Sequence, residues 1–207
     1  MLSGQEKDVG SEKLSRFIWL WIIIIVLFIS CARQSGEIIT DQESPALFPV
    51  EIDGRWGFID RRGRKVIGPK YEGAFRFSDG RALVRQRGKW GYINRWEVFV
   101  IRPDFTEAHE FSEGLAHVKV GDRYGYIGKS GNFAIEPRFE DASNFSEGLA
   151  SVKMNGWWGY IDKSGSLVIP PDFGQAHAFS GGLALVLIDG KGGYIDKSGS
   201  IIIDPIY

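Results

Sequence analysis

The chain has 207 residues with 25 basic and 26 acidic side chains, and its isoelectric point is near 6.3. Because a protein that holds nucleic acid normally presents a clearly basic face, this balance excludes nucleic acid as a partner. Aromatic residues make up 14% of the chain, and 27 residues are glycine. This mixture favours many short strands joined by tight turns, and therefore an all-β fold.

The amino-terminal part contains an uncharged stretch, FIWLWIIIIVLFISCA, between Arg16 and Arg33. As a helix it would be about 24 Å long at ~1.5 Å per residue. A hydrocarbon core is ~30 Å thick, so the stretch is short for a spanning helix. A basic flank, a short apolar run and small residues at its end are typical of an export signal. We therefore predict a signal peptide over residues 1–30.

The single cysteine, Cys31, directly follows this apolar run and Ser30. The segment FISCA resembles the lipobox of bacterial lipoproteins, although Phe28 stands where that motif prefers Leu. The resemblance implies cleavage before Cys31 and attachment of a diacylglycerol to its thiol. Residues 31–42 are then a lipid-anchored tether. The alternative is an uncleaved anchor in which Cys31 is an inert apolar residue.

The remaining residues, 43–207, repeat with a period of 34 residues, which indicates a tandem repeat architecture. Each unit carries a glycine preceded, in most units, by an aromatic residue. The five pairs are Trp56 and Gly57, Trp90 and Gly91, Tyr124 and Gly125, Trp158 and Gly159, and Gly192 and Gly193. Glycine recurs there because a side chain would block a close approach of neighbouring backbone, and the aromatic residue is expected to pack over it.

One unit can be divided into three strands and a connector. Residues 114–120, GLAHVKV, alternate apolar and polar side chains as a half-buried strand does. RYGYIG at 123–128 is the second strand, and NFAIEP at 132–137 is the third, which we expect to end at its proline. In the hairpin loops, Asp60, Asp162 and Asp196 are expected to stabilise the turns. The serine of FSEG is expected to bond its own turn.

The columns W-G-[FY]-I-D-K-S-G, I-x-P-x-[FY] and F-S-E-G-L-A-x-V resemble the WG (also called KWG) repeats of bacterial proteins. The resemblance covers residues 43–207 in about five copies. It implies a bacterial, often exported, β-repeat protein. Tyr124 and Gly192 replace Trp, so a uniform ligand site on the Trp column is not expected.

Two assemblies of these units are open. Residues 43–50, ESPALFPV, align with FSEGLAHV, so they would close a ring, as in β-propellers, by pairing with the hairpin at 191–203. An open, curved array of the same units is the alternative.

Candidate functional residues are few. We expect no catalytic site, metal site or cofactor, and His109, His117 and His177 are interpreted as surface or connector residues. Trp96, at a hairpin tip, and Trp157, where other units have Lys or Arg, are candidate partner-binding residues.

These observations favour a cell-envelope lipoprotein, held on the membrane by its lipid, that acts as a binding or scaffolding module for a protein or glycan. The alternative is an enzyme acting on envelope polymers, with a site assembled across repeats. Its candidate carboxylates lie in the connectors: Glu107, Glu110, Glu113, Glu140 and Glu147.

Overall fold

The computed structural model describes residues 46–206, which lie within the unit Pro45–Tyr207. The proposed signal peptide, Cys31 and the tether at 31–42 lie outside the described residues. Within residues 46–206 the chain forms nineteen strands and no helix. This part of the chain therefore offers no helix with the length and apolar character needed to cross a membrane.

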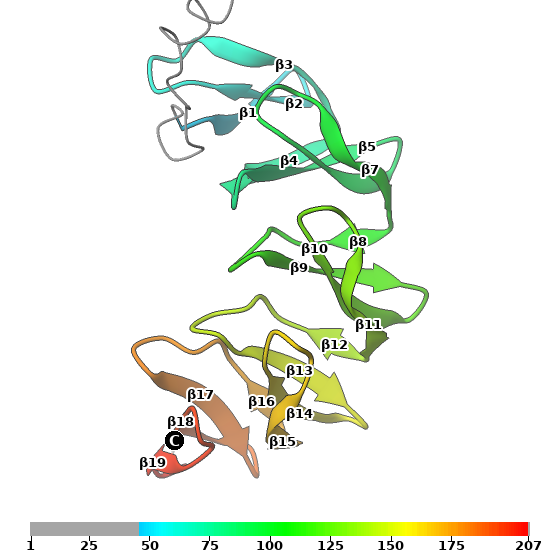
Figure 1. Ribbon diagram of the computed structural model, residues 1–207. Coiled ribbons are helices and arrows are strands. Elements are labelled where there is room, and N and C mark those ends of the chain that lie inside the picture. Colours follow the sequence, from blue (N-terminus) through cyan, green and yellow to red (C-terminus); the bar gives the residue numbers. More distant parts are fainter. Residues whose placement is uncertain (1–45, 207) are drawn as a thin grey trace, which may run out of the picture. The chain divides into compact units, whose positions relative to one another are not determined.

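The strands form five antiparallel sheets in chain order (Figure 1). The first sheet contains β1 (Phe48–Ile52), β2 (Arg55–Ile59) and β3 (Lys65–Tyr71). The second contains β4 (Gly73–Ser78), β5 (Arg81–Gln86), β6 (Lys89–Ile93) and β7 (Phe99–Phe105). The third contains β8 (Glu107–Ala108), β9 (Leu115–Val120), β10 (Arg123–Gly128) and β11 (Phe133–Phe139). The fourth contains β12 (Asp141–Ala142), β13 (Ala150–Met154), β14 (Trp157–Ile161) and β15 (Leu167–Phe173). The fifth contains β16 (Gln175–Ala176), β17 (Leu183–Ile188), β18 (Lys191–Asp196) and β19 (Ile201–Ile203).

The all-β repeat is confirmed, but the expected three strands per unit are wrong for four of the five sheets. The connector contributes a fourth strand, which in the third sheet is only Glu107 and Ala108, paired with Lys119 and Val118. In the third, fourth and fifth sheets this strand has only two residues, which is too short to show an alternating pattern, so no sequence signal predicted it.

Of the two assemblies that the sequence left open, the structure shows the open array and not the closed ring. Residues 48–52 pair with β2, from Phe48 opposite Ile59 to Ile52 opposite Arg55. The hairpin at 191–203 instead belongs to a sheet that β16 and β17 complete. Each of the second to fifth sheets therefore consists of a connector strand followed by the three strands after it, and the described sheets form an open series (Figure 1).

The hydrophobic core lies between consecutive sheets. In one cluster Tyr126, Ile135 and Phe139 of the third sheet pack with Phe145 and Val152 of the fourth. Tyr126, Phe139 and Phe145 are at most 1% exposed. Because no sheet can bury its apolar face alone, burial between neighbours is the main stabilising contribution.

The FSEG turns form a second connection between sheets. The Ser112 hydroxyl donates a hydrogen bond to the carbonyl oxygen of Phe145, 33 residues later, at 2.7 Å. The Glu113 carboxylate accepts one from the Gly148 amide at 3.1 Å. The same contacts recur from Ser78 to Phe111, Ser146 to Phe179, Asp79 to Gly114 and Glu147 to Gly182. The expectation that this serine bonds its own turn is therefore wrong.

The glycine column lies against the backbone of the neighbouring strand. A Cβ atom at Gly125 would lie 2.7 Å from the Ile135 carbonyl oxygen and 2.7 Å from the Pro137 nitrogen. Strand β11 continues through Pro137 to Phe139, so the expected end of the strand at proline is wrong. A register shift between Tyr124 and Tyr126 accommodates the proline, and β11 is an edge strand, where a missing N–H is tolerated.

Candidate functional site

Open grooves lie at two of the joints between consecutive sheets, and at the other two joints a side chain of one repeat column occupies the equivalent position. We name the grooves 1–2, 2–3, 3–4 and 4–5 after the sheets on either side. The column holds a charged residue followed by an aromatic residue. The pairs are Lys70 and Tyr71, Asp104 and Phe105, Arg138 and Phe139, and Asp172 and Phe173. The charge therefore alternates between cation and anion along the array.

In grooves 1–2 and 3–4 a cation covers the aromatic ring. The Lys70 ammonium lies 5.5 Å from the Tyr71 ring centroid and pairs with Glu97 of the next sheet. The Arg138 guanidinium lies 5.0 Å from the Phe139 centroid and donates a hydrogen bond to the carbonyl oxygen of Gly165 at 2.5 Å. Both rings are 0% exposed. These two grooves are thus filled by side chains of the chain itself.

Groove 2–3 is open, with a volume of about 430 Å³. Phe105, Val120 and Phe133 provide its apolar lining, and Lys89, Asp104 and Lys119 are the charged groups. Two cations beside one carboxylate make this groove electrostatically mixed.

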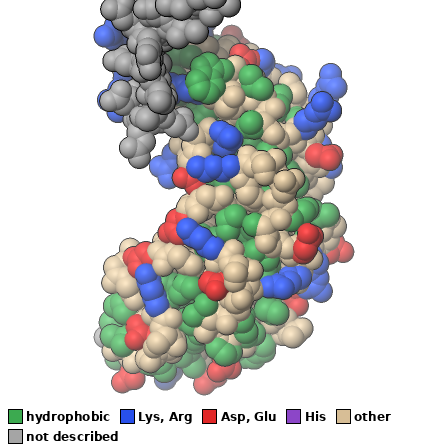
Figure 2. Space-filling view, viewed as in Figure 1, with side chains coloured by type: hydrophobic (Ala, Val, Ile, Leu, Met, Phe, Trp, Pro, Cys, Tyr) green, Lys and Arg blue, Asp and Glu red, His purple; other side chains and the backbone are tan. Residues whose placement is uncertain are grey.

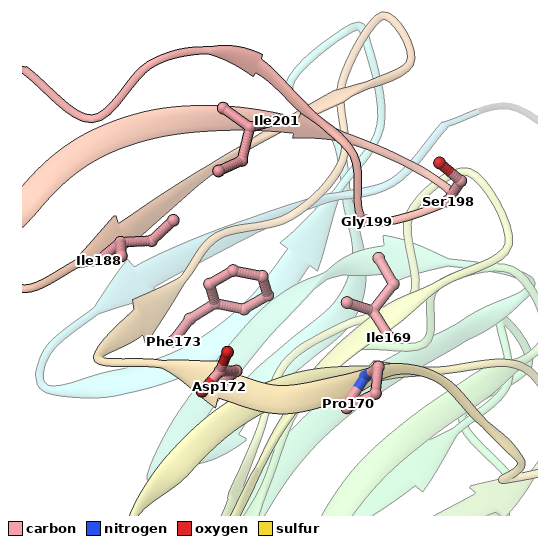
Figure 3. Close-up of a pocket in the computed structure, with 8 residues that line it drawn as sticks. All are labelled: Ile169, Pro170, Asp172, Phe173, Ile188, Ser198, Gly199 and Ile201. Atoms are coloured by element: carbon pink, nitrogen blue, oxygen red, sulfur yellow. The ribbon is translucent and has the colours of Figure 1, made fainter.

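Groove 4–5 is open as well, with a volume of about 380 Å³ (Figure 3). Its lining is mostly apolar, with Asp172 and Ser198 as the polar side chains, and consists of Ile169, Pro170, Asp172, Phe173, Ile188, Ser198, Gly199 and Ile201. Asp172 is its one charged residue, and this carboxylate forms no ion pair with any described residue. Phe173, without a cation above it, is 7% exposed.

The two candidate tryptophans are both exposed. Trp96 is 73% exposed in the loop between β6 and β7, and Trp157 is 52% exposed at the start of β14. The structure does not bring the two together, because they belong to different, non-adjacent sheets. Trp157 occupies the repeat position of Lys89, which lines groove 2–3, but it is not among the residues that line groove 4–5.

The aromatic column varies with the residue on the connector strand of the same sheet. A Cβ atom at Gly73 would lie 3.0 Å from Cη2 of Trp90, so Trp90 fills the space above that glycine. In the third sheet the equivalent connector residue is Glu107, and the shorter Tyr124 donates a hydrogen bond to its carboxylate. The Trp-to-Tyr change therefore accompanies a larger neighbour.

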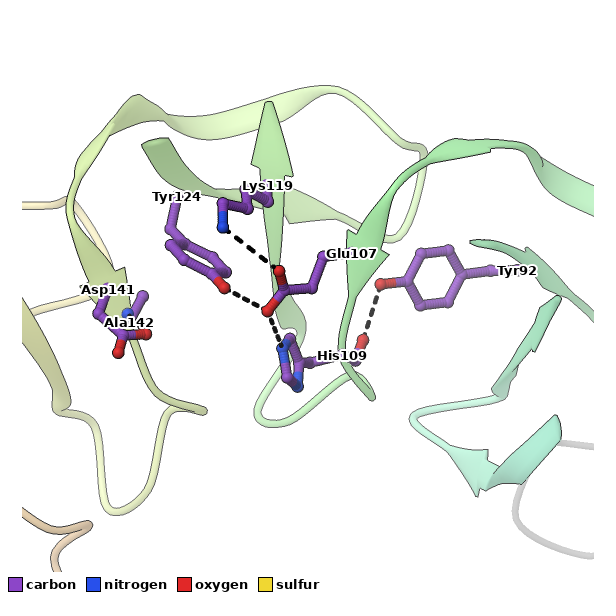
Figure 4. A network of polar contacts seen from close by, with 7 residues as sticks. All are labelled: Tyr92, Glu107, His109, Lys119, Tyr124, Asp141 and Ala142. Atoms are coloured by element: carbon purple, nitrogen blue, oxygen red, sulfur yellow. Dashed lines mark hydrogen bonds and ion pairs between the residues drawn. The ribbon is translucent and has the colours of Figure 1, made fainter. Parts of the chain in front are cut away.

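A polar network surrounds Glu107 in the third sheet (Figure 4). Besides Tyr124, Lys119 lies 3.5 Å and His109 Nε2 3.8 Å from the carboxylate. The hydrogen bond from Tyr124 lowers the pKa of Glu107, and burial raises the pKa of Tyr124. Because its members lie in or beside β8, β9 and β10, the network joins strands of one sheet.

His117 departs from the expected surface position. It is 4% exposed and stacks on His109, with ring centroids 3.8 Å apart and 14° between planes. The same column holds Leu83, Ser151 and Leu185 in the second, fourth and fifth sheets, so the two leucines were the sequence signal for a buried position. Neither histidine belongs to a cluster of metal-ligating residues among residues 46–206.

The connector and turn carboxylates of the enzyme alternative are held in separate structural contacts. Glu113 and Glu147 accept bonds from glycine amides of the next sheet, Glu140 accepts bonds from the amides of Asn155 and Gly156, and Glu110 lies 3.6 Å from Arg76. Asp162 accepts bonds from two amides of its own hairpin loop, which confirms the expected turn role. On the face seen in Figure 2, acidic and basic side chains are interspersed.

The sequence matches the family described as "WG containing repeat" at residues 56–90, 90–124, 124–156, 158–191 and 193–207. The chain therefore belongs to the WG-repeat family. No curated protein matches it.

Solved structures that resemble the chain have little sequence identity to it. Hsv2 of Kluyveromyces lactis has a TM-score of 0.53 at 10% identity, over 76% of this chain and 59% of that one. A second Hsv2 structure, with complete loop 6CD, has a TM-score of 0.51 at 12% identity, over 78% and 59%. A structure titled as the eukaryotic initiation factor has a TM-score of 0.50 at 14% identity, over 78% and 53%. The chain thus spans less than two thirds of each, and the likeness concerns the β-repeat fold alone.

Proposed function

We propose that this WG-repeat chain is a binding or scaffolding module of the bacterial cell envelope, held on the membrane by a lipid on Cys31, with a protein or glycan as partner. The observation that carries the binding role is groove 4–5, whose apolar lining, unlike that of groove 3–4, is not covered by a side chain of the chain itself. An apolar groove with few polar groups is typical of a binding site.

A role without catalysis agrees with how the polar groups are used. Glu107 is engaged by Tyr124 and Lys119, and the turn carboxylates bond backbone amides of the next sheet. The nearly equal numbers of acidic and basic residues support a partner other than nucleic acid.

The binding role is tested by photo-cross-linking in cells that produce the full chain. A photoreactive amino acid replaces Ile201, which lines groove 4–5, and in a matched control it replaces Val66 of the first sheet; both residues are 50% exposed. We expect one discrete cross-linked species from position 201 and none from position 66. Equal cross-linking at both positions, or none at 201, would contradict the proposal.

The anchor is tested separately. Mass spectrometry of the membrane-purified protein should find Cys31 as the mature amino terminus carrying acyl chains, and Cys31→Ser should leave an uncleaved precursor. An intact segment 17–30 in the unaltered protein would refute the lipoprotein assignment.

A further inference from the structure

The four grooves lie at equivalent positions of the repeat. The side chain that fills one groove therefore indicates the chemistry of a ligand that fits an open one. Arg138, Phe139 and Gly165 of groove 3–4 correspond, 34 residues later, to Asp172, Phe173 and Gly199 of groove 4–5. In groove 3–4 the guanidinium stacks on the ring and bonds the glycine carbonyl. In groove 4–5 the ring and the glycine remain, and the cation is replaced by a carboxylate.

We propose that groove 4–5 binds the arginine side chain of a protein partner. The guanidinium would lie over Phe173, as that of Arg138 lies over Phe139, and would donate hydrogen bonds to the Gly199 carbonyl and the Asp172 carboxylate. This inference rests on the proposed binding function and specifies the chemistry of the ligand.

Charge and lining favour arginine at this groove. Asp172 is exposed and has no cationic partner among the described residues, and a basic residue is absent from the lining. The planar guanidinium can stack on an aromatic ring while donating to two acceptors, which a lysine ammonium does less well. At the repeat positions of Lys119 and Lys89, two cations that line groove 2–3, the chain has Leu187 and Trp157, so groove 4–5 lacks the cations that would repel an arginine in groove 2–3.

The repeat also indicates why the site would be selective. The Ile188 and Ile201 side chains line the groove opposite Phe173 (Figure 3). An apolar lining favours the weakly hydrated guanidinium face, and a single carboxylate disfavours a neutral or anionic side chain of the same shape. Citrulline, which keeps the shape of arginine and removes the charge, is therefore a suitable control.

The test follows amide chemical shifts of the full chain, kept in detergent micelles, during titration with the capped peptide Gly-Ser-Arg-Ser-Gly or its citrulline counterpart. We expect the arginine peptide to shift the amides of Phe173, Gly199 and Ile201. The citrulline peptide should bind more weakly, by a factor of at least about ten. Equal affinities, or shifts confined to other grooves, would overturn the proposal.

Two exchanges within the repeat column complete the test. Asp172→Arg places a guanidinium of the chain itself in groove 4–5. It should therefore weaken peptide binding by about tenfold or more. Arg138→Asp opens groove 3–4 and should create a second set of shifts, at Phe139 and Gly165. Binding that neither exchange alters would overturn the proposal. If the peptide does not bind but the cross-link from position 201 persists in cells, the arginine chemistry is wrong while the binding function stands.

Discussion

The Ser112 hydroxyl donates a hydrogen bond to the carbonyl oxygen of Phe145 at 2.7 Å, and so joins the third sheet to the fourth. Phe145 is 1% exposed, so its carbonyl oxygen has little access to water once this donor is removed. The contact recurs at two other joints, which makes it a regular part of how consecutive sheets are held together.

We therefore predict that Ser112→Ala lowers the free energy of unfolding by about 1–2 kcal/mol, because it leaves a buried acceptor without a partner. Ser180→Ala is the matched control, since Ser180 is exposed and its hydroxyl bonds no described carbonyl. That change should stay within about 0.5 kcal/mol of the unaltered protein. Chemical denaturation measures both, and equal stabilities of the two variants would argue against the inter-sheet role.

The glycine column gives a second prediction. Gly125→Val places a branched side chain where even a Cβ atom would lie 2.7 Å from backbone of β11, so the strand must move. We expect a loss of about 3 kcal/mol or more. Lys129→Ala, at the exposed tip of the following hairpin, should change stability by no more than about 0.5 kcal/mol. Melting temperatures compare the two, and a shared value would refute the crowding argument.

The stacked histidines predict a pH dependence. Burial, with a smaller contribution from His109, lowers the pKa of His117 to about 3. Below about pH 6.5 the unfolded chain takes up a proton at this residue and the native chain does not, so stability falls as the pH decreases toward about 3. The loss should reach roughly 2 kcal/mol at about pH 5.

His117→Leu, which introduces the residue found at positions 83 and 185, should make unfolding less sensitive to pH across this window. His177→Ser is the control, because His177 is exposed and belongs to the column of His109. Denaturation curves at about pH 7.5 and about pH 5 decide the matter. An undiminished pH dependence in His117→Leu would show that another group is responsible.

The open series of sheets predicts a local response to truncation. A chain that begins at Asp53 lacks β1, which pairs with β2. Hydrogen exchange should show reduced amide protection at Trp56–Ile59 and unchanged protection at Tyr194 and Ile195, because β18 pairs with β17 and β19. Reduced protection at 194–195 would instead indicate a closed ring.

Local patterns predicted the hairpins well. The strands around Gly125 follow from alternating side chains and from turn residues at fixed spacing, and the loop role of Asp162 follows from its position before the turn. Such features depend on residues close together in the sequence, so one copy of the repeat contains enough information to predict them.

Contacts between sheets were not predictable from one copy. The Ser112 bond reaches 33 residues ahead, and β8 consists of only two residues. The sequence contains the alternation of charge at Lys70, Asp104, Arg138 and Asp172, the column that borders the candidate groove. Its meaning required knowing that this column borders the next sheet, which depends on where each sheet begins and ends.

The most direct test of the account combines the cross-link from position 201 with a substitution that fills groove 4–5. Asp172→Arg should abolish the cross-linked species in cells, since a guanidinium in cis would occupy the place of the partner's arginine. Asp104→Arg, the matched change in groove 2–3, should leave the species unchanged, and both variants should accumulate to the level of the unaltered protein. A cross-link from position 201 that persists at full yield in Asp172→Arg would contradict the claim that this groove is the binding site.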